Sequence, residues 1–170
     1  MHFKKQTRLM GNQFEFTLIE QSENQAEEFF EIAINEIKRI EKLLTTFSDT
    51  SITYKINENA GIQPIEVTDE VFQLIKRSQF ISKITQGAFD LSYGSIDKRF
   101  WNFDVNMTSL PDVETAKKSV ELINYENIIL DENDKTVFLK NKGMRIGFGG
   151  IGKGYAAEMA KKKLKEINVK

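Results

Sequence analysis

The sequence contains no cysteine, a single histidine and only two prolines. Without cysteine the chain has no disulfides, thiol nucleophiles, thiolate metal sites or lipid-modified thiol. The only histidine is His2, beside the start of the sequence, so histidine catalysis is excluded for the rest of these residues. The composition gives no indication of the redox compartment.

An excess of one charge and a long apolar run are also lacking. Lysine and arginine total 24, while aspartate and glutamate total 25, so no net field exists to attract nucleic acid or an anionic membrane. No run approaches the roughly 18 apolar residues of a spanning helix. Residues 1–16, MHFKKQTRLMGNQFEF, lack the apolar core of an export signal. The sequence therefore indicates a cytoplasmic protein, or one whose export signal preceded Met1.

What is present is the composition of a globular chain. Apolar residues make up 40% and charged residues 29% of the 170 residues, as in ordinary folded proteins. That length provides for one domain or for part of a larger one. No repeat or low-complexity linker interrupts the chain, so we expect residues 1–170 to form a single unit.

Four helices are predicted from apolar spacing and capping residues. Ser22 and Gln25 form a capping-box pattern ahead of a long amphipathic helix over Glu23–Thr46. A second helix follows Thr68 and ends at Gly87, a third follows Pro111 and runs to about Leu122, and a fourth follows the glycines near the end.

Strands are predicted between these helices. They comprise residues 13–20 (QFEFTLIE), a hairpin over 127–141 (NIILDENDKTVFLKN) and a strand just before Gly147. The final EINVK, residues 166–170, resembles the entry to a further strand. Helices and strands do not alternate strictly, so we predict an α+β fold with a mixed or antiparallel sheet and several packed helices.

The glycine-rich stretch GFGGIGKG, residues 147–154, matches two nucleotide motifs incompletely. A dinucleotide fingerprint requires an acidic residue about 20 positions further on, and only sixteen residues follow Gly154. A P-loop requires serine or threonine where Gly154 stands. Two interpretations remain. Either the helix start and Lys153 bind phosphate oxygens, or the glycines pack a strand closely against a helix.

Five stretches together resemble one family, the ApbE-type flavin transferases. They are LMGNQFEF at 9–16, FSDTSITYKINENAG at 47–61, TQGAFDLS at 85–92, RFWNF at 99–103 and IGFGGIGKGYAAE at 146–158. They occur in the order and spacing of the family from Met10 to Glu158. The resemblance implies the N-terminal part of a larger ApbE-like (T-fold-like) domain.

The resemblance also implies a set of site residues. The cofactor-binding residues would be Met10, Phe47, Ala88, Phe89, Asp90 and Lys153, and the carbonyl of Gly150 would join a metal site. Three of them have a plainer alternative: Met10 and Phe47 as core side chains, and Asp90 as the cap of the following turn. No catalytic residue is identified.

Four positions depart from the family pattern. Phe47 stands where the family often has tyrosine, so a polar contact through a tyrosine hydroxyl is not carried over. Asn12 stands where threonine or serine is usual, and Glu158 stands where aspartate is usual. Gly147 replaces a common acidic residue, so no carboxylate contact to the cofactor is carried over there.

The function implied is transfer of FMN from FAD to a threonine of a target protein, with Mg²⁺. The family's metal-binding Asp and Thr and its histidine loop belong to a second half that these residues do not include, so this part alone is expected to be inactive. Family members are often periplasmic or anchored on the outer face of the cytoplasmic membrane. The alternatives are a flavin-binding module without transfer chemistry and a structural domain without a ligand.

Overall fold

The computed structural model describes residues 1–96 and 112–169. Contacts within the chain divide it into two compact units. The terminal unit comprises Met1–Thr45 and Gly149–Lys170, and the central unit comprises Thr46–Phe148. The formation of a single unit by residues 1–170 stays a prediction. The RFWNF stretch and Pro111 lie outside the described residues.

The terminal unit begins with a β-hairpin. Strand β1 (His2–Leu9) pairs antiparallel with β2 (Asn12–Ile19), and Leu9 is opposite Asn12. The two turn residues, Met10 and Gly11, have φ values of 51° and 73°, as two-residue type I′ hairpin loops require. Only β2 was predicted. β1 was missed because its long polar side chains conceal the alternation.

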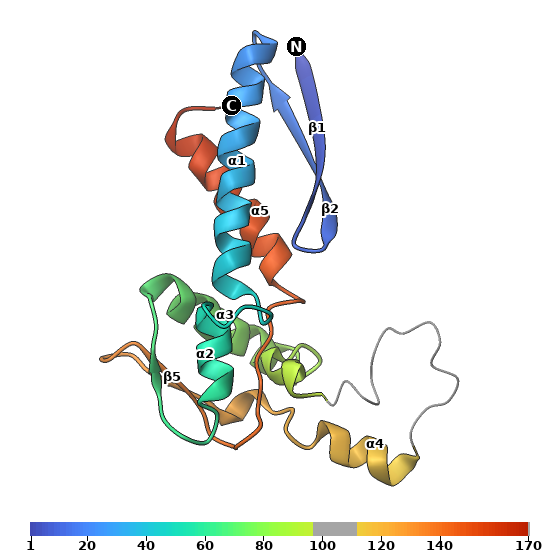
Figure 1. Ribbon diagram of the computed structural model, residues 1–170, viewed down its shortest axis with the longest axis vertical. Helices are drawn as coiled ribbons and strands as arrows, with labels where there is room; N and C mark the ends of the chain where they lie inside the picture. Colours follow the sequence, from blue (N-terminus) through green and yellow to red (C-terminus); the bar gives the residue numbers. More distant parts are fainter. Residues whose placement is uncertain (97–111, 170) are drawn as a thin grey trace. The chain divides into compact units, whose positions relative to one another are not determined.

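Alternation in the hairpin places its apolar face on α1 (Glu23–Leu44). The ring of Phe16 lies edge-on to that of Phe30, with centroids 6.2 Å apart. Lys5 is paired with Glu27 and Glu31 on the same helix. Figure 1 shows the hairpin beside α1, and α5 (Gly152–Glu166) also packs on α1.

The ends of α1 and α5 are set by capping. The Ser22 hydroxyl accepts from Gln25 N, as predicted, and α1 ends at Leu44 rather than Thr46 because Thr45 is extended. After α5, Asn168 has a φ of 62° and Val169 N donates to Leu164 O. This is a Schellman motif. The predicted strand entry at EINVK is therefore wrong: its described residues end a helix.

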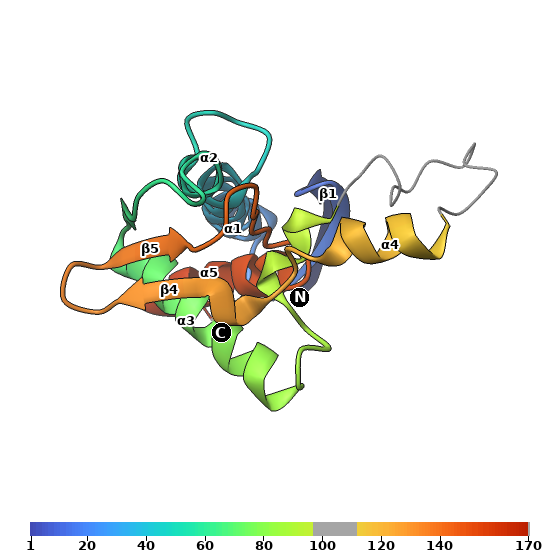
Figure 2. The same cartoon turned by 90° about the horizontal axis from the view of Figure 1, so that it is seen from below.

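The central unit is built around a three-stranded antiparallel sheet of order β3-β5-β4. The predicted hairpin is confirmed, with β4 at Ile128–Asp131 and β5 at Thr136–Leu139, and β3 (Ile65–Glu66) adds to β5. Helix α3 (Asp69–Ile84) lies against this hairpin (Figure 2), where Gln79 Nε2 donates to Ile128 O at 2.5 Å.

The remaining helices of the central unit are short. They are α2 (Ile52–Glu58), the 3₁₀ turns η1 (Leu91–Ser95) and η2 (Tyr125–Asn127), and α4 (Val113–Val120). Helix α4 begins after Asp112, whose pKa is lowered by hydrogen bonds from Thr115. Its end at Val120 falls before the predicted Leu122. Helix α3 starts after Thr68 as predicted, and ends at Ile84, with Gly87 N donating to Ser82 O.

The strand predicted before the glycines is not a β-strand. Met144, Ile146 and Phe148 are buried in alternation, so the period-2 pattern is real. However, the backbone hydrogen bonds of this segment go to side chains and to a turn. Ile146 N donates to Asn57 Oδ1 at 2.8 Å, and Asn57 Nδ2 donates to Ile146 O at 3.1 Å. An amide side chain thus takes the place of a neighbouring strand.

The described parts of the chain confirm the predicted α+β class, with antiparallel pairing in both sheets. Among these residues, no helix combines the length and apolar character needed to cross a bilayer.

Candidate flavin site

Asp90 is held by hydrogen bonds at the start of η1. Its Oδ1 accepts from Ser92 N at 2.7 Å and from Ser92 Oγ at 2.6 Å, and its Oδ2 accepts from Tyr125 N at 2.9 Å. Ser92 Oγ in turn accepts from Asn124 N at 2.8 Å. The Asp90 carboxylate therefore joins two loops of the central unit. A carboxylate has about four acceptor positions, so a ligand contact by Asp90 stays a prediction.

Ala88 and Phe89 occupy the loop between α3 and Asp90. Ala88 is exposed and Phe89 is half-buried. Phe89 N donates to Thr85 Oγ1 at 3.2 Å, and Ala88 N donates to Thr85 O at 3.0 Å. The end of α3 thus fixes the loop backbone, and the contact of either residue with a cofactor stays a prediction.

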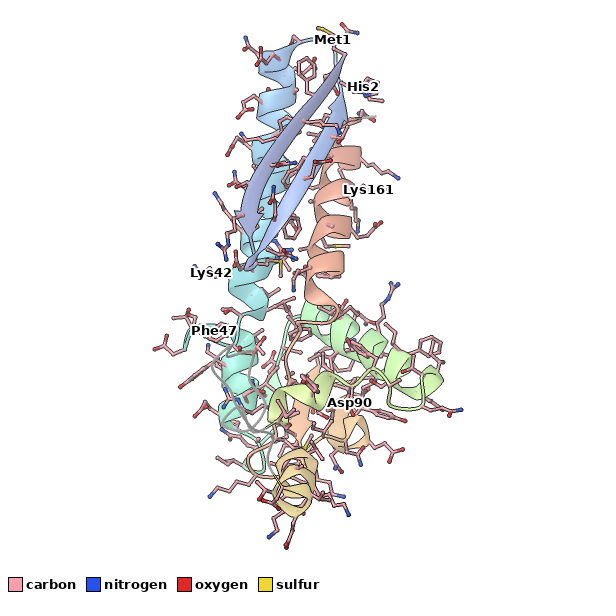
Figure 3. All side chains as sticks on the ribbon, turned by 90° about the vertical axis from the view of Figure 1, so that its right-hand side faces the viewer. Met1, His2, Lys42, Phe47, Asp90 and Lys161 are labelled. Carbon is pink, nitrogen blue, oxygen red and sulfur yellow. The ribbon has the colours of Figure 1, made fainter. Side chains whose placement is uncertain are left out.

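Phe47 lies on a hollow of the central unit with a cavity volume of about 480 Å³. The hollow is lined by Thr46, Phe47, Gly94, Ile96, Arg145, Ile146 and Gly147. We call it the Phe47 hollow. Phe47 is 89% exposed, so the alternative interpretation as a core side chain does not describe it (Figure 3 labels Phe47 and Asp90).

Close backbone contact between η1 and the segment after Met144 shapes this hollow. A Cβ added at Gly94 would lie 2.8 Å from Ile146 C, so the backbone there has no room for a side chain. Gly147 N donates to Leu91 O at 3.1 Å. Ser95 Oγ accepts from Arg145 N at 2.8 Å and donates to Arg145 O at 3.0 Å. Asn57 and Ser95 therefore position the residues that line the hollow.

Lys153 and Gly150 lie at the start of α5 in the terminal unit. Ile151, the residue that caps α5, makes no side-chain capping hydrogen bond, and the first turn contains no acidic residue. Lys153 Nζ lies 3.4 Å from Gly149 O. The helix start therefore presents N–H groups and an ammonium group, a combination suited to phosphate oxygens.

Three glycines of this stretch, Gly147, Gly149 and Gly154, are not explained by packing against the described residues. No described atom lies within 4 Å of a Cβ added at Gly149 or Gly154, and at Gly147 the nearest such atom is Gly94 Cα at 3.8 Å. None of these three has a positive φ. As far as the described residues go, packing and conformation thus leave room for a side chain at each of the three. Glycine at these positions is compatible with a ligand that approaches the backbone closely.

Met10 is the first residue of the β1–β2 turn and is half-buried. Its left-handed conformation is unfavourable for a residue other than glycine, asparagine or aspartate. Asn12, which departs from the family pattern two residues later, starts β2 and is exposed. Met10 thus adopts this conformation at an energetic cost, which is compatible with a contact role.

We expect Met10→Asn to raise the free energy of unfolding by about 0.5–1 kcal/mol, because Asn-Gly is the preferred type I′ pair. The same change should weaken FAD binding if Met10 contacts the flavin. Met10→Leu is the matched control, since leucine retains both the apolar contact and the conformational cost. Urea unfolding measures the first effect. Equal stability of the two variants would contradict the assignment of strain to this turn.

The predicted site residues therefore fall into two groups. Phe47, Ala88, Phe89 and Asp90 belong to the central unit, and Met10, Gly150 and Lys153 belong to the terminal unit. Within the central unit, Phe47 and Gly147 line one hollow, and Asp90 precedes the turn that supplies Gly94 to it. Sequence reasoning missed Asn57 and Ser92, which lie within two of the family-like stretches but were not singled out, and Ser95 and Arg145, which lie outside those stretches.

Metal ligands are sparse in the described parts of the chain. No group of three or more His, Asp or Glu side chains there is arranged to hold a metal ion. Gly150 is exposed and offers a carbonyl, while Mg²⁺ usually requires carboxylate ligands. Glu158 is also exposed, as expected for a solvated helix residue. The described residues alone do not fit a Mg²⁺ site.

The family model of the ApbE family matches residues 10–170. The chain belongs to the ApbE family. It is 34% identical to the FAD:protein FMN transferase of Klebsiella pneumoniae over 161 residues, covering 95% of this chain and 49% of the relative. It is 26% identical to the enzyme of the same name from Treponema pallidum, covering 72% of this chain and 35% of that protein.

Solved ApbE structures establish the same fold. The ApbE protein of Thermotoga maritima matches with a TM-score of 0.87 and 24% identity, covering 99% of this chain and 54% of that one. The flavin transferase ApbE of Vibrio cholerae matches with a TM-score of 0.86 and 15% identity, covering 99% and 55%. The chain thus spans about half the length of these ApbE proteins, and the family resemblance is confirmed.

Proposed function

We propose that this chain carries FAD-binding residues of a FAD:protein FMN transferase. The support is its identity to the Klebsiella pneumoniae transferase, 34% over 161 residues, together with the glycines at the start of α5. The observation that carries the proposal is the open space at Gly149 and Gly154. Beside them Lys153 supplies a positive charge. A phosphate group can approach this backbone closely and accept from its N–H groups.

The finer parts of the proposal concern the reaction. A threonine hydroxyl of a target protein would attack the FMN phosphorus of FAD. An ester bond from the threonine oxygen to phosphorus forms, the pyrophosphate bond breaks, and AMP leaves while the hydroxyl proton passes to a base. Mg²⁺ would offset charge on the phosphoryl oxygens. Gly150 would contribute a carbonyl to that metal site, but its other ligands would lie outside the described residues.

The proposed contribution of the described residues is to bind and orient FAD. In the terminal unit, Lys153 and the first N–H groups of α5 would neutralise and orient phosphate, and Met10 would contact the flavin. In the central unit, Phe47, Ala88 and Phe89 would provide apolar contact, and Asp90 would use its remaining acceptor positions. Positioning of this kind accounts for a large part of the rate gained in phosphoryl-transfer reactions.

The test is a titration of this chain with FAD, followed by flavin fluorescence, for the wild type and the Gly149→Ala/Gly154→Ala double variant. We expect the double variant to be at least as stable as the wild type, because no described atom obstructs either Cβ. Alanine should add up to about 1 kcal/mol of helix stability at Gly154. We also expect FAD affinity to fall by about tenfold or more, since the methyl groups would lie where phosphate approaches.

Glu158→Ala, an exposed change further along the same helix, is the control and should bind FAD like the wild type. Undiminished FAD affinity in the double variant would refute the glycine site. Absence of any FAD binding by the folded wild-type chain would refute the FAD-binding proposal itself.

A flavin-binding module without transfer chemistry is the second candidate. It is favoured by glycine at position 147, where the family commonly has an acidic residue. The two candidates differ in a transfer assay with a full-length protein that contains this chain, FAD, Mg²⁺ and a threonine-containing acceptor. Covalent labelling of the acceptor with release of AMP supports the transferase. Bound FAD without labelling supports the module.

A further inference from the structure

Arg145 and Gly147 face the same side of an extended segment. Met144, Ile146 and Phe148 are 0%, 0% and 5% exposed, so the alternating residues between them point to the opposite side. Both of these residues line the Phe47 hollow. This face therefore carries a guanidinium group and, two residues on, no side chain.

The backbone of Arg145 is held in place by hydrogen bonds. Its N–H and its carbonyl oxygen are both hydrogen-bonded to Ser95 Oγ, at 2.8 Å and 3.0 Å. The neighbouring Ile146 is hydrogen-bonded to the Asn57 amide. A ligand that binds the guanidinium group thus meets a side chain whose backbone is already ordered, and this lowers the entropic cost of binding.

The charged end of Arg145 is weakly engaged. Its partner in the described part of the chain is Glu58, with Nη1 3.5 Å from Oε1 and side-chain exposures of 42% and 50%. Ion pairs this exposed contribute little. A phosphate group can replace this contact with a shorter bidentate pair, the geometry for which arginine is best suited.

The rest of the hollow favours an anion that carries a planar ring. Among the described residues that line the hollow, Arg145 is the charged one and none is a carboxylate. The ring of Phe47 is 89% exposed on the same hollow, and an exposed ring offers a face for stacking. The volume of about 480 Å³ falls within the range of ligand sites, about 300–1,000 Å³.

We propose that Arg145 is a specificity-determining residue that binds a phosphate group of the flavin nucleotide in the Phe47 hollow. This inference rests on the proposed function, because the ligand is taken to be the flavin. Arg145 selects phosphorylated flavins over riboflavin, and Phe47 contacts a ring of the same ligand. Because Gly147 has no side chain, position 147 adds no second carboxylate beside the guanidinium group, which is paired only with the exposed Glu58 among the described residues.

The experiment compares FAD, FMN and riboflavin as ligands of this chain by fluorescence titration. The wild type should bind FAD and FMN more tightly than riboflavin. Arg145→Gln should lower the affinity for FAD and FMN by about tenfold or more, the value of a charge-assisted hydrogen bond, and leave riboflavin binding unchanged. The hydrogen bonds to Ser95 use the Arg145 backbone, so we expect the variant to fold.

Two further variants test the charge on this face. Gly147→Asp should weaken FAD and FMN binding while riboflavin binding is retained, because the new carboxylate lies beside the guanidinium group. A Cβ there meets Gly94 Cα at an ordinary 3.8 Å. Lys142→Gln, which removes an exposed charge of the same unit that is absent from the lining, should bind all three ligands like the wild type.

The outcomes separate the inference from the function on which it rests. If Arg145→Gln binds FAD as the wild type does, or loses all three ligands equally, the phosphate assignment is overturned while flavin binding stands. If the wild type binds no flavin, the proposed function fails for this chain, and the assignment fails with it.

Discussion

Replacing Asn57 with alanine is expected to lower the free energy of unfolding by about 3 kcal/mol, because it leaves two buried backbone groups without partners. The Asn57 side chain, 5% exposed, accepts from Ile146 N and donates to Ile146 O at 2.8 Å and 3.1 Å. Alanine offers neither group, and the two chain segments close the space to water. Urea unfolding of the variant and the wild type measures the loss.

Asn57→Asp separates the two hydrogen bonds. An aspartate oxygen still accepts from Ile146 N, but the other oxygen then faces the Ile146 carbonyl, acceptor against acceptor. We expect this variant to lose at least as much stability as the alanine variant, since a buried charge near a carbonyl oxygen is costly.

Asn59→Ala is the matched control, because its side chain makes exposed hydrogen bonds at the end of the same helix. We expect it to cost less than about 1 kcal/mol. Equal losses at the two positions would show that the paired amide of Asn57 has no special part in holding the extended segment. A loss confined to Asn57 should also disturb the Phe47 hollow, because Ile146 and Gly147 line it.

Asn57 also explains why one strand could not be predicted correctly. The alternation over 144–148 is that of a strand buried on one face, and the burial agrees with it. A β-strand, however, is defined by backbone hydrogen bonds to a neighbouring strand. Here the partner of Ile146 is an amide 89 positions away in the sequence, on α2. The local pattern indicates extended backbone, but it cannot indicate which groups form hydrogen bonds with that backbone.

The elements that were predicted correctly have their causes close by in the sequence. Ser22 caps α1 through Gln25 N, and Thr68 caps α3 through Val71 N. The β4–β5 hairpin is formed by two β-branched and aromatic runs around a polar turn. Helix α2 received no prediction although Ser51 caps it through Tyr54 N and Ile56 is buried. That cap was the signal that could have revealed it.

The candidate site shows the same division. Motifs indicated Phe47 and the glycines, and the structure places Phe47 and Gly147 on one hollow. Arg145 belongs to no motif, and its place there depends on Ser95 and Asn57, which contact it or its neighbour from distant parts of the chain. Tertiary contacts of this kind are absent from any local pattern.

Asp90→Ala is expected to lower the free energy of unfolding by about 3 kcal/mol, since it removes the acceptor of three hydrogen bonds, one of them from another loop. Ser92 N and Oγ lose their partner within the turn, and Tyr125 N loses its partner at 2.9 Å. Ser92 is 0% exposed, so its freed hydroxyl proton is not readily hydrated. Urea unfolding measures the loss.

Asp90→Asn distinguishes the structural role from a ligand contact. The amide oxygen can keep both hydrogen bonds from Ser92, whereas an amide NH₂ facing Tyr125 N places donor against donor. We therefore expect a loss smaller than that of Asp90→Ala, of about 1–2 kcal/mol. If the alanine variant is as stable as the wild type, the carboxylate does not join the two loops.

The same pair of variants tests whether Asp90 also contacts FAD. A fall in FAD affinity for Asp90→Ala alone is ambiguous, because loss of the loop connection would displace η1 and Gly94 with it. Asp90→Asn, measured where it is fully folded, removes the charge while η1 keeps its cap. Weakened FAD binding by that variant would show that the Asp90 carboxylate contacts the ligand. Unchanged binding, with the stability losses above, assigns Asp90 to the architecture of the site alone.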